Sequence, residues 1–285
     1  MTAPATMRSA IDSAAAQLAE VGIDSARYDA EELAAHLAGT ERGRLPLLES
    51  PGDEFFGRYR DLVAARSRRV PLQHLTGTTA FGPVTLNVGP GVFIPRPETE
   101  AMLEWATAQP LPARPLVVDV CTGSGALAVA LAHHRPAARV IGIDDSEAAL
   151  TYARRNAAGT PAELVRADVT TPGLLPELDG LVDLVVANPP YVPDDHAVAT
   201  EVAQHDPSHA VFGGPDGMAV IAAVVRLAGR WLRPGGLFAV EHDDTTSSRT
   251  VQLVEDTGLF EGVEARHDLT GRPRFVTARR GERRQ

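Results

Sequence analysis

Two hydrophobic patterns divide the chain near residue 72. Before that point, apolar residues recur at helical spacing in three stretches, residues 9–22, 24–39 and 53–69. Side chains three and four residues apart share one face of a helix, so each stretch presents an apolar stripe. A glycine closes each of the first two stretches, as is common at helix ends. We therefore predict a small helical bundle over residues 1–72.

The pattern changes after the bundle. Residues 73–90 are rich in Gly, Pro and Thr, with short β-like pieces around Gly82-Pro83, and we predict a hairpin linker there. From residue 91 onward, short apolar runs alternate with helical segments. The strand-like runs are residues 115–120, 138–144, 162–168, 181–188, 235–242 and 274–280. Strands that alternate with helices form a parallel sheet covered on both faces, so residues 91–285 are predicted to form an α/β domain.

Composition narrows the possible functions. All 27 basic residues are arginine, so the chain offers no lysine for a Schiff base or a Walker-type phosphate loop. The one cysteine, Cys121, excludes an internal disulfide framework and suits a reducing compartment. No apolar run reaches about 18 residues and the N-terminus lacks a signal-peptide pattern, so we expect a cytoplasmic protein without a membrane segment. The net charge of −10 disfavours a stable complex with nucleic acid.

Candidate binding residues gather where the predicted strands end. In parallel α/β sheets, ligands bind at the carboxyl ends of the strands. The first strand carries Asp119 and runs into the loop Cys121-Thr122-Gly123-Ser124-Gly125, whose glycines let the backbone approach a ligand. The second strand ends at Asp144, about 20 residues later, where a carboxylate can bind a ribose diol. The third ends near Asp168 and Val169, where an adenine amino group can be bound.

Two cofactor classes compete for this loop. Gly123-x-Gly125-x-x-Ala128 followed by Asp144 also fits the dinucleotide fingerprint of nicotinamide oxidoreductases, a weak motif when it stands alone. Asp119, two residues before the loop, suits a cationic ligand better than a pyrophosphate. S-adenosylmethionine carries a sulfonium, an α-ammonium and a ribose but no phosphate. We therefore favour S-adenosylmethionine as the cofactor.

The fourth strand ends in Asn188-Pro189-Pro190-Tyr191, where the two prolines end the strand because they cannot donate ladder hydrogen bonds. The plain alternative is a strand-ending turn. A planar amide or exocyclic amine is a poor nucleophile and must be held in line by fixed acceptors. The Asn188 side-chain oxygen and the Pro189 carbonyl oxygen are two such acceptors, and the Tyr191 ring offers a face for stacking. We predict that these four residues bind the substrate and catalyse its methylation by positioning.

The order of these motifs carries a family resemblance. The segments "IPRPETE", "DVCTGSG", "NPPYVP" and "LRPGGLFAVEH" resemble the PrmC/HemK methyltransferases, within a similarity that covers about residues 71–279. The resemblance implies a Rossmann-like, seven-stranded class I methyltransferase sheet with a small N-terminal helical domain. It implies methyl transfer from S-adenosylmethionine to the side-chain amide nitrogen (N5) of the glutamine in the GGQ motif of class I peptide-chain release factors, which supports translation termination. Residues 121–125, Asp144 and Asn188 would contact the cofactor, and residues 188–191 would hold the glutamine.

Two departures from the family pattern stand out. Cys121 replaces the usual glycine of the loop, and a small buried thiol there is compatible with cofactor binding. His242-Asp243-Asp244 follows Glu241, where the family more often has Glu-x-Gly and then Gln. A metal site is disfavoured because the chemistry needs none and adjacent strand residues point to opposite faces. We predict no metal.

Several peripheral features have two interpretations. By family analogy, Arg96 and Glu98 border the cofactor, although both could be ordinary loop residues. The loop Phe212–Gly217 is either a turn or a mobile segment that folds over the substrate. Residues 1–72 contain no chemical cluster, and we predict that they dock a protein substrate, which needs more surface than one glutamine pocket. We expect a monomer.

Two other functions stay open on the sequence. Methylation of adenine or cytosine amino groups in nucleic acid uses similar motifs, but it needs a basic target-recognition region that this acidic chain lacks. A nicotinamide oxidoreductase would leave residues 188–191 without a role.

Overall fold

The computed structural model describes residues 6–49 and 51–282, which form two compact units. Within the described residues, the first unit runs to Thr78 and also takes in Ala199–His205. The second unit contains Thr79–Val198 and the residues from Asp206 onward. A short segment that follows the predicted substrate residues in the chain is therefore part of the helical unit.

The first unit is a helical bundle. Its helices are α1 (Met7–Glu20), α2 (Ala26–Ala38), α3 (Asp53–Ser67), α4 (Leu72–Thr76) and α8 (Thr200–His205), with the 3-10 turn η1 (Arg42–Leu47). The three stretches with helical spacing form α1, α2 and α3, which confirms the predicted helical character. Leu18, Leu33 and Tyr59 are buried between them, and the Tyr59 hydroxyl donates to the Ala30 carbonyl oxygen at 2.8 Å.

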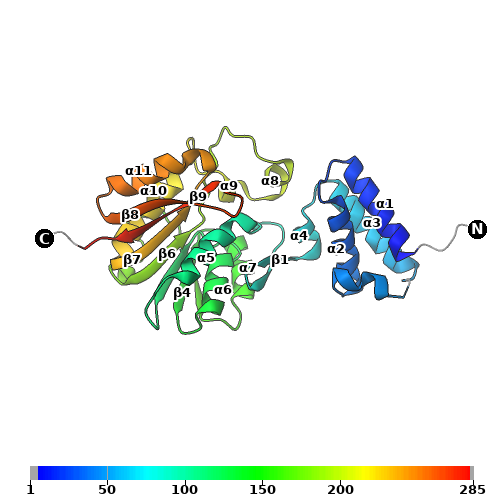
Figure 1. Cartoon of the computed structure of the whole chain (residues 1–285), viewed down its shortest axis with the longest axis horizontal. Helices are drawn as coiled ribbons and strands as arrows, with labels where there is room; N and C mark the ends of the chain where they lie inside the picture. The colour runs from blue at the N-terminus through cyan, green and yellow to red at the C-terminus, as the bar shows by residue number, and fades with distance from the viewer. Residues whose placement is uncertain (1–5, 50, 283–285) are drawn as a thin grey trace, which may run out of the picture. The chain divides into compact units, whose positions relative to one another are not determined.

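The second unit is built on a seven-stranded sheet (Figure 1). Its strands are β3 (Leu116–Val120), β4 (Arg139–Asp144), β5 (Ala162–Arg166), β6 (Val182–Ala187), β7 (Leu232–Glu241), β8 (Phe260–His267) and β9 (Pro273–Arg280). The strand order is β5-β4-β3-β6-β7-β9-β8. β9 is antiparallel to β7 and to β8, and the other neighbouring strands pair in parallel. The sheet confirms the predicted Rossmann-like α/β class; β8 is the strand that the hydrophobic pattern missed.

Helices cover both faces of the sheet, as Figure 1 shows. α5 (Glu100–Ala108), α6 (Ala126–His134) and α7 (Glu147–Asn156) lie on one side, and α10 (Ala219–Trp231) and α11 (Ser247–Asp256) lie on the other. Every residue of β6 is buried. Leu184 and Val186 face the α5–α6 layer, whereas Val185 and Ala187 face α10, because successive strand residues point to opposite faces. β6 ends at Ala187, just before Asn188 and the two prolines, which cannot donate ladder hydrogen bonds.

Short elements complete the second unit. They are the hairpin strands β1 (Thr78–Phe81) and β2 (Val84–Asn87), the helix α9 (Ser208–Val211), and the 3-10 turns η2 (Pro97–Thr99), η3 (Pro176–Leu178) and η4 (Asp244–Thr246).

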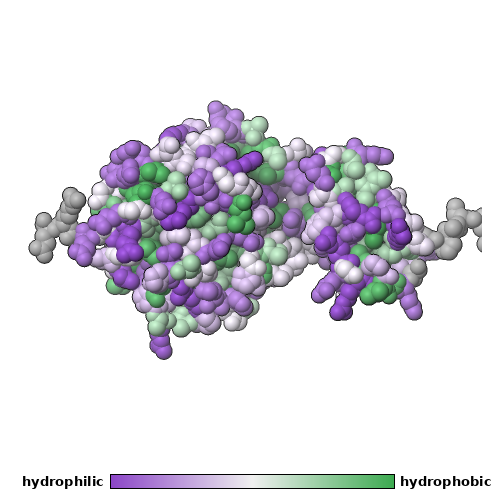
Figure 2. Space-filling view, viewed as in Figure 1, coloured by the Kyte–Doolittle hydropathy of each residue, from purple (hydrophilic) through white to green (hydrophobic). Residues whose placement is uncertain are grey.

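Hydrophilic residues cover most of the face shown in Figure 2, with small apolar groups between them. Among the helices of residues 6–49 and 51–282, none is long and apolar enough to cross a membrane.

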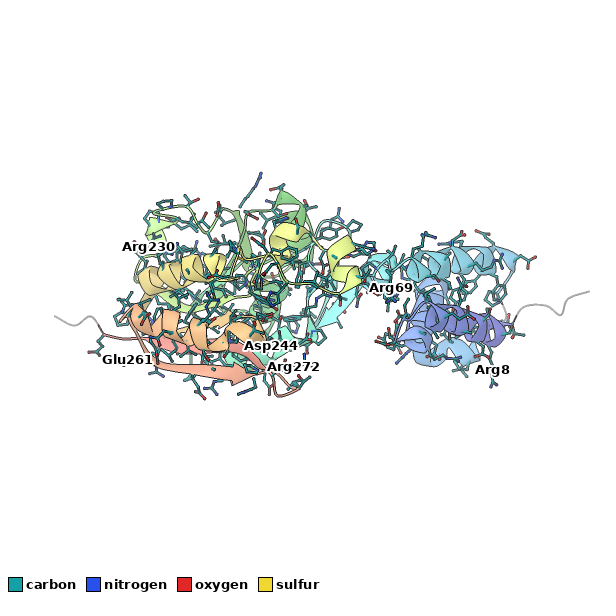
Figure 3. The ribbon with its side chains drawn as sticks, turned by 90° about the horizontal axis from the view of Figure 1, so that it is seen from above. Arg8, Arg69, Arg230, Asp244, Glu261 and Arg272 are labelled. Atoms are coloured by element: carbon teal, nitrogen blue, oxygen red, sulfur yellow. The ribbon has the colours of Figure 1, made fainter. Side chains whose placement is uncertain are left out.

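A buried arginine holds α8 in the helical unit. Arg66 of α3 is 5 % exposed, and its Nε donates to the Asp29 carboxylate of α2 at 2.6 Å. Its Nη1 donates to the Glu201 carboxylate of α8 at 2.8 Å and to the Val70 carbonyl oxygen at 3.1 Å. Arg69, labelled in Figure 3, lies near the same glutamate at 3.8 Å. One side chain thus joins three segments that are far apart in the sequence.

We predict that Arg66→Ala lowers the free energy of unfolding of the helical unit by about 3–5 kcal/mol, since it leaves the Asp29 carboxylate buried without its counter-charge. The matched control is Arg27→Ala, which also removes a guanidinium bonded to two carboxylates, those of Asp12 and Glu31, but at an exposed position. Its loss should stay below about 1 kcal/mol. Urea denaturation measures both, and equal losses would contradict the assigned role of Arg66.

Candidate active site

The loop after β3 is shaped by its glycines. Gly125 has φ +85° and starts α6, and a Cβ atom there would stand only 3.4 Å from Ala153. Its amide donates to the Thr122 carbonyl oxygen at 2.8 Å, and the Thr122 amide donates to Ile143 of β4 at 2.9 Å. Gly123 has φ +57°, but a Cβ atom there would meet nothing within 4 Å. The loop is therefore anchored on one side and open at Gly123.

Asp144 closes one end of this loop. Its Oδ2 accepts from the Gly123 amide at 2.8 Å, and its Oδ1 accepts from the Ser146 amide at 2.9 Å. Burial raises the pKa of Asp144, while these two backbone hydrogen bonds oppose the rise. A carboxylate oxygen can accept more than one hydrogen bond, so Asp144 can still accept from two vicinal hydroxyls.

Asp119 lies beneath the loop and is almost fully buried. It is 1 % exposed, and its Oδ2 accepts from the Thr122 hydroxyl at 2.5 Å and from the Ala128 amide at 2.9 Å. Burial raises the pKa of Asp119 to about 7. The prediction that Asp119 faces a cationic ligand stays a prediction. Its Oδ2 is bonded to the loop and to the first turn of α6, so Asp119 also supports the loop.

The third predicted contact lies at the end of β5. Asp168 is exposed and its Oδ1 accepts from the amide and the hydroxyl of Thr170 at 2.8 and 2.7 Å, hydrogen bonds that lower the pKa of Asp168. Val169 is buried in the α10 layer of the core. The two neighbours therefore point to different environments, one polar and one apolar.

These residues fit a ligand that carries an adenosine. Asp144 can accept from a diol, Gly123 leaves room for close approach, and the buried Ser124 hydroxyl has no hydrogen-bond partner among the described residues. No basic side chain occurs in residues 121–125, which matches a ligand without phosphate. Among the described residues there is no group of three or more His, Cys, Asp or Glu side chains that could hold a metal ion.

The predicted substrate residues belong to a buried hydrogen-bond chain. Asn188 Nδ2 donates to Thr99 Oγ1 at 3.1 Å, and the Thr99 hydroxyl donates to Glu241 Oε2 at 2.8 Å. The Tyr191 hydroxyl donates to Glu241 Oε1 at 2.9 Å. Thr99 comes from η2 and Glu241 is the last residue of β7. One carboxylate therefore connects to both ends of the 188–191 segment.

Burial and charge set the electrostatics of this chain. Burial raises the pKa of Glu241 to about 7, although hydrogen bonds from Thr99 and Tyr191 and the charge of Arg274 act in the opposite direction. Burial and the nearby Glu241 raise the pKa of Tyr191 well above its usual value, so the phenol stays a donor. Arg274 of β9 is itself held by the Asp268 carboxylate at 3.2 Å.

The loop Phe212–Gly217 packs against the backbone of this segment. The Gly213 amide donates to the Val192 carbonyl oxygen at 2.9 Å. A Cβ atom on Gly213 would stand 2.5 Å from the Pro190 carbonyl oxygen, and one on Gly217 would stand 2.2 Å from that of Tyr191. Only glycine fits such an approach. The loop 212–217 thus packs closely against the backbone of residues 190–192 and supports it.

Sequence reasoning missed Thr99, Glu241 and Arg274 as site residues and gave Tyr191 only a stacking ring. A signal for Glu241 was available in the sequence, because it stands near the carboxyl end of the strand-like run 235–242. In the structure Val240 lies opposite Ala187, which places Glu241 beside Asn188. Of the two residues expected to border the cofactor, Glu98 has a buried Oε2 without a hydrogen-bond partner among the described residues. Arg96 pairs with Asp206 and stacks over the Phe93 ring at 4.8 Å.

The unusual run after Glu241 also has a structural explanation. His242 is fully buried, and its Nδ1 donates to the Asp243 carbonyl oxygen at 2.8 Å. The Asp243 carboxylate caps η4 by accepting from the Thr245 amide at 2.9 Å. Both residues thus shape the turn that follows β7.

Comparison with known proteins places this geometry in a family. A family model for the PrmC N-terminal domain matches residues 9–77, and one for a methyltransferase domain matches residues 117–205. The chain is 77% identical over 279 residues to release factor glutamine methyltransferase of Mycobacterium tuberculosis (strain ATCC 25618 / H37Rv), covering 96% of this chain and 92% of the relative. The chain belongs to the release factor glutamine methyltransferase family. Its α/β unit is thus a class I methyltransferase fold that uses S-adenosylmethionine.

Two further relatives frame the family. Release factor glutamine methyltransferase of Mycobacterium leprae (strain TN) is 74% identical over 97% of both chains. A protein of Streptomyces pristinaespiralis, named 4-amino-L-phenylalanine/4-methylamino-L-phenylalanine methyltransferase, is 42% identical over 93% of both chains. Relatives with substantial identity to this chain are thus named for different substrates. One name refers to release factor glutamine and the other to 4-amino-L-phenylalanine and its methylamino derivative.

We predict that Asp144→Ala weakens S-adenosylmethionine binding by about 1.5–3 kcal/mol, the cost of losing hydrogen bonds to a charged group. Asp145→Ala is the control, because it removes the adjacent exposed carboxylate and leaves Asp144 bonded to the loop. Isothermal titration calorimetry measures both affinities. An unchanged affinity in Asp144→Ala would mean that the ribose lies elsewhere.

A second prediction concerns Cys121, whose φ of +60° lies in the left-handed region that favours glycine. We expect Cys121→Gly to be more stable than Cys121→Ala by about 1 kcal/mol, because a Cβ atom is strained at this φ. The alanine variant removes the thiol but keeps the strain, so the difference isolates the backbone. Thermal unfolding with equal stabilities for the two variants would show that the loop relaxes instead.

Proposed function

We propose that this chain transfers a methyl group to the side-chain amide nitrogen, N5, of the glutamine in the GGQ motif of class I peptide-chain release factors. The reaction would support translation termination in the cytoplasm. The observation that carries the proposal is the Asn188–Thr99–Glu241 chain, which leaves the Asn188 amide oxygen for a substrate N–H. The family membership supplies the substrate class.

The proposed mechanism rests on positioning. S-adenosylmethionine supplies an electrophilic methyl group on a sulfonium. Asn188 Oδ1 and the Pro189 carbonyl oxygen accept the two N–H groups of the glutamine amide, and Pro190 keeps that carbonyl rigid. The Tyr191 ring packs against the amide plane. Residues 121–125 together with Asp119, Asp144, Asp168 and Val169 hold the cofactor or support its loop. The amide nitrogen would bond to the methyl carbon as the carbon–sulfur bond breaks, which leaves S-adenosylhomocysteine. The amide proton would then pass to water, so no strong base is needed.

We further propose that residues 1–72 dock the release factor, that residues 73–90 link them to the catalytic domain of residues 91–285, and that the enzyme acts as a monomer without a stable nucleic-acid complex. α8 supports the docking role, because this short segment follows the 188–191 segment in the chain yet packs within the helical unit through Arg66. A protein substrate needs a surface larger than one side-chain pocket.

The proposed substrate is tested with labelled S-adenosylmethionine and four acceptors: a class I release factor, the same factor with the GGQ glutamine replaced by alanine, 4-amino-L-phenylalanine, and total RNA. We expect label in the intact factor alone. Label in the arylamine with none in the release factor would contradict the proposal, as would equal labelling of the factor without its glutamine.

We predict that Asn188→Ala slows methyl transfer by about 3–4 kcal/mol, hundreds-fold in rate, because the substrate amide loses a preorganised acceptor. Single-turnover transfer to a release factor at saturating S-adenosylmethionine separates this effect from cofactor affinity. If the variant stayed within a few-fold of wild type, the 188–191 segment would be only a strand-ending turn, and the proposed mechanism would fall with it.

A further inference from the structure

The Asn188 amide poses an orientation problem. Its oxygen and NH2 ends are nearly the same size, so either end fits sterically into the site. A substrate amide that presents N–H groups needs the oxygen; the NH2 end would place a donor against a donor. Something in the protein must therefore choose the oxygen. This argument rests on the proposed use of Asn188 as an acceptor.

The hydrogen-bond chain behind Asn188 has only one consistent direction when Glu241 is ionised. A carboxylate accepts and does not donate. The single Thr99 hydroxyl proton must then go to Glu241 Oε2, 2.8 Å away. The Thr99 oxygen is left as an acceptor, and its partner at 3.1 Å must be the donating nitrogen of Asn188.

Water has little access to these groups and therefore cannot easily change the direction of the hydrogen bonds. Thr99 is 3 % exposed and Glu241 is 1 % exposed, so neither can exchange its partner freely for solvent. A reversed Asn188 would set its oxygen against the Thr99 oxygen, with no proton between them. In a buried site such an unmet acceptor is costly enough to favour one orientation by about fivefold to a hundredfold.

We infer that Glu241 and Thr99 are positioning residues: together they fix the direction of the Asn188 amide, so that its oxygen faces the substrate and the site selects groups that donate an N–H. The second oxygen of Glu241 accepts from the Tyr191 hydroxyl at 2.9 Å, so the same carboxylate also fixes the ring at the other end of the segment. Neither Thr99 nor Glu241 needs to touch the substrate for this.

The protonation of Glu241 offers an independent check. Burial and Glu98 of η2 raise the pKa of Glu241, Arg274 of β9 and the Thr99 and Tyr191 hydroxyls lower it, and the balance lies at about 7. A protonated Glu241 can donate to the Thr99 oxygen, and the Thr99 hydroxyl can then donate to the oxygen of a reversed Asn188 amide. The ionised form dominates above the pKa, so turnover should rise as the pH passes upward through about 7.

The variants of the test differ by few atoms. Glu241→Gln keeps the size of the side chain but adds an NH2 that can donate to Thr99, which permits the reversed Asn188. Thr99→Val keeps the shape of the threonine without its hydroxyl, and Thr99→Ser is the conservative rescue. We expect kcat for release-factor methylation to fall by about two- to tenfold in Glu241→Gln and in Thr99→Val, because the fraction of Asn188 in the accepting direction decreases. Thr99→Ser should remain near wild type, and S-adenosylmethionine affinity by calorimetry should change little in all three.

Two readouts separate positioning from general destabilisation. In the Asn188→Ala background, Glu241→Gln should cause little further loss, because the amide that it orients is gone. The rise of kcat near pH 7 should be absent in Glu241→Gln. Losses that add in the double variant, or a Thr99→Val enzyme with nearly full kcat, would overturn the inference. If Glu241→Gln does not fold, the comparison of Thr99→Val with Thr99→Ser and the pH profile of the wild-type enzyme test the same inference.

Failure of this inference is distinct from failure of the proposed function. Wild-type enzyme that does not label a release factor contradicts the function. Wild-type enzyme that labels the factor, with additive losses in the variants, contradicts only the roles of Thr99 and Glu241.

Discussion

The buried hydrogen-bond chain from Asn188 through Thr99 to Glu241 is the constraint on which the site depends. It joins the end of β6, the turn η2 and the end of β7, three segments that are far apart in the sequence. The parallel register of β6 and β7 brings Glu241 beside Asn188, and Pro189 and Pro190 end β6 because they lack the N–H donor of the ladder. In the proposed mechanism, positioning chemistry without a strong base relies on these buried supports.

The parts of the candidate site that are formed by residues adjacent in the sequence could be predicted. Asn188 to Tyr191 and the loop 121–125 stand at the carboxyl ends of apolar runs, and the rule for parallel sheets places them at one edge. Six of the seven strands were visible in the sequence, and inner strands such as β3 and β6 are continuously apolar or nearly so because they are buried on both faces. β8 was not, because it lies at the sheet edge and "FEGVEARH" mixes charges with apolar residues.

The remaining features depend on tertiary partners that a linear pattern does not carry. The contacts of Asp119 with the Thr122 hydroxyl and the Ala128 amide arise from the turn into α6, which the sequence pattern does not show. Tyr191 was expected to act by its ring, and its hydroxyl partner lies 50 residues away. Likewise, nothing local in residues 199–205 shows that Arg66 draws them into the helical unit.

The most direct test of this account is a crystal structure of the wild-type enzyme with a glutamine peptide and S-adenosylhomocysteine, the demethylated cofactor. We expect the glutamine amide nitrogen within about 3.2 Å of Asn188 Oδ1, a normal hydrogen-bond distance, with Asn188 Nδ2 still on Thr99. A glutamine nitrogen bound away from Asn188, or an Asn188 that has released Thr99 to reach the peptide, would contradict the central role of the buried chain.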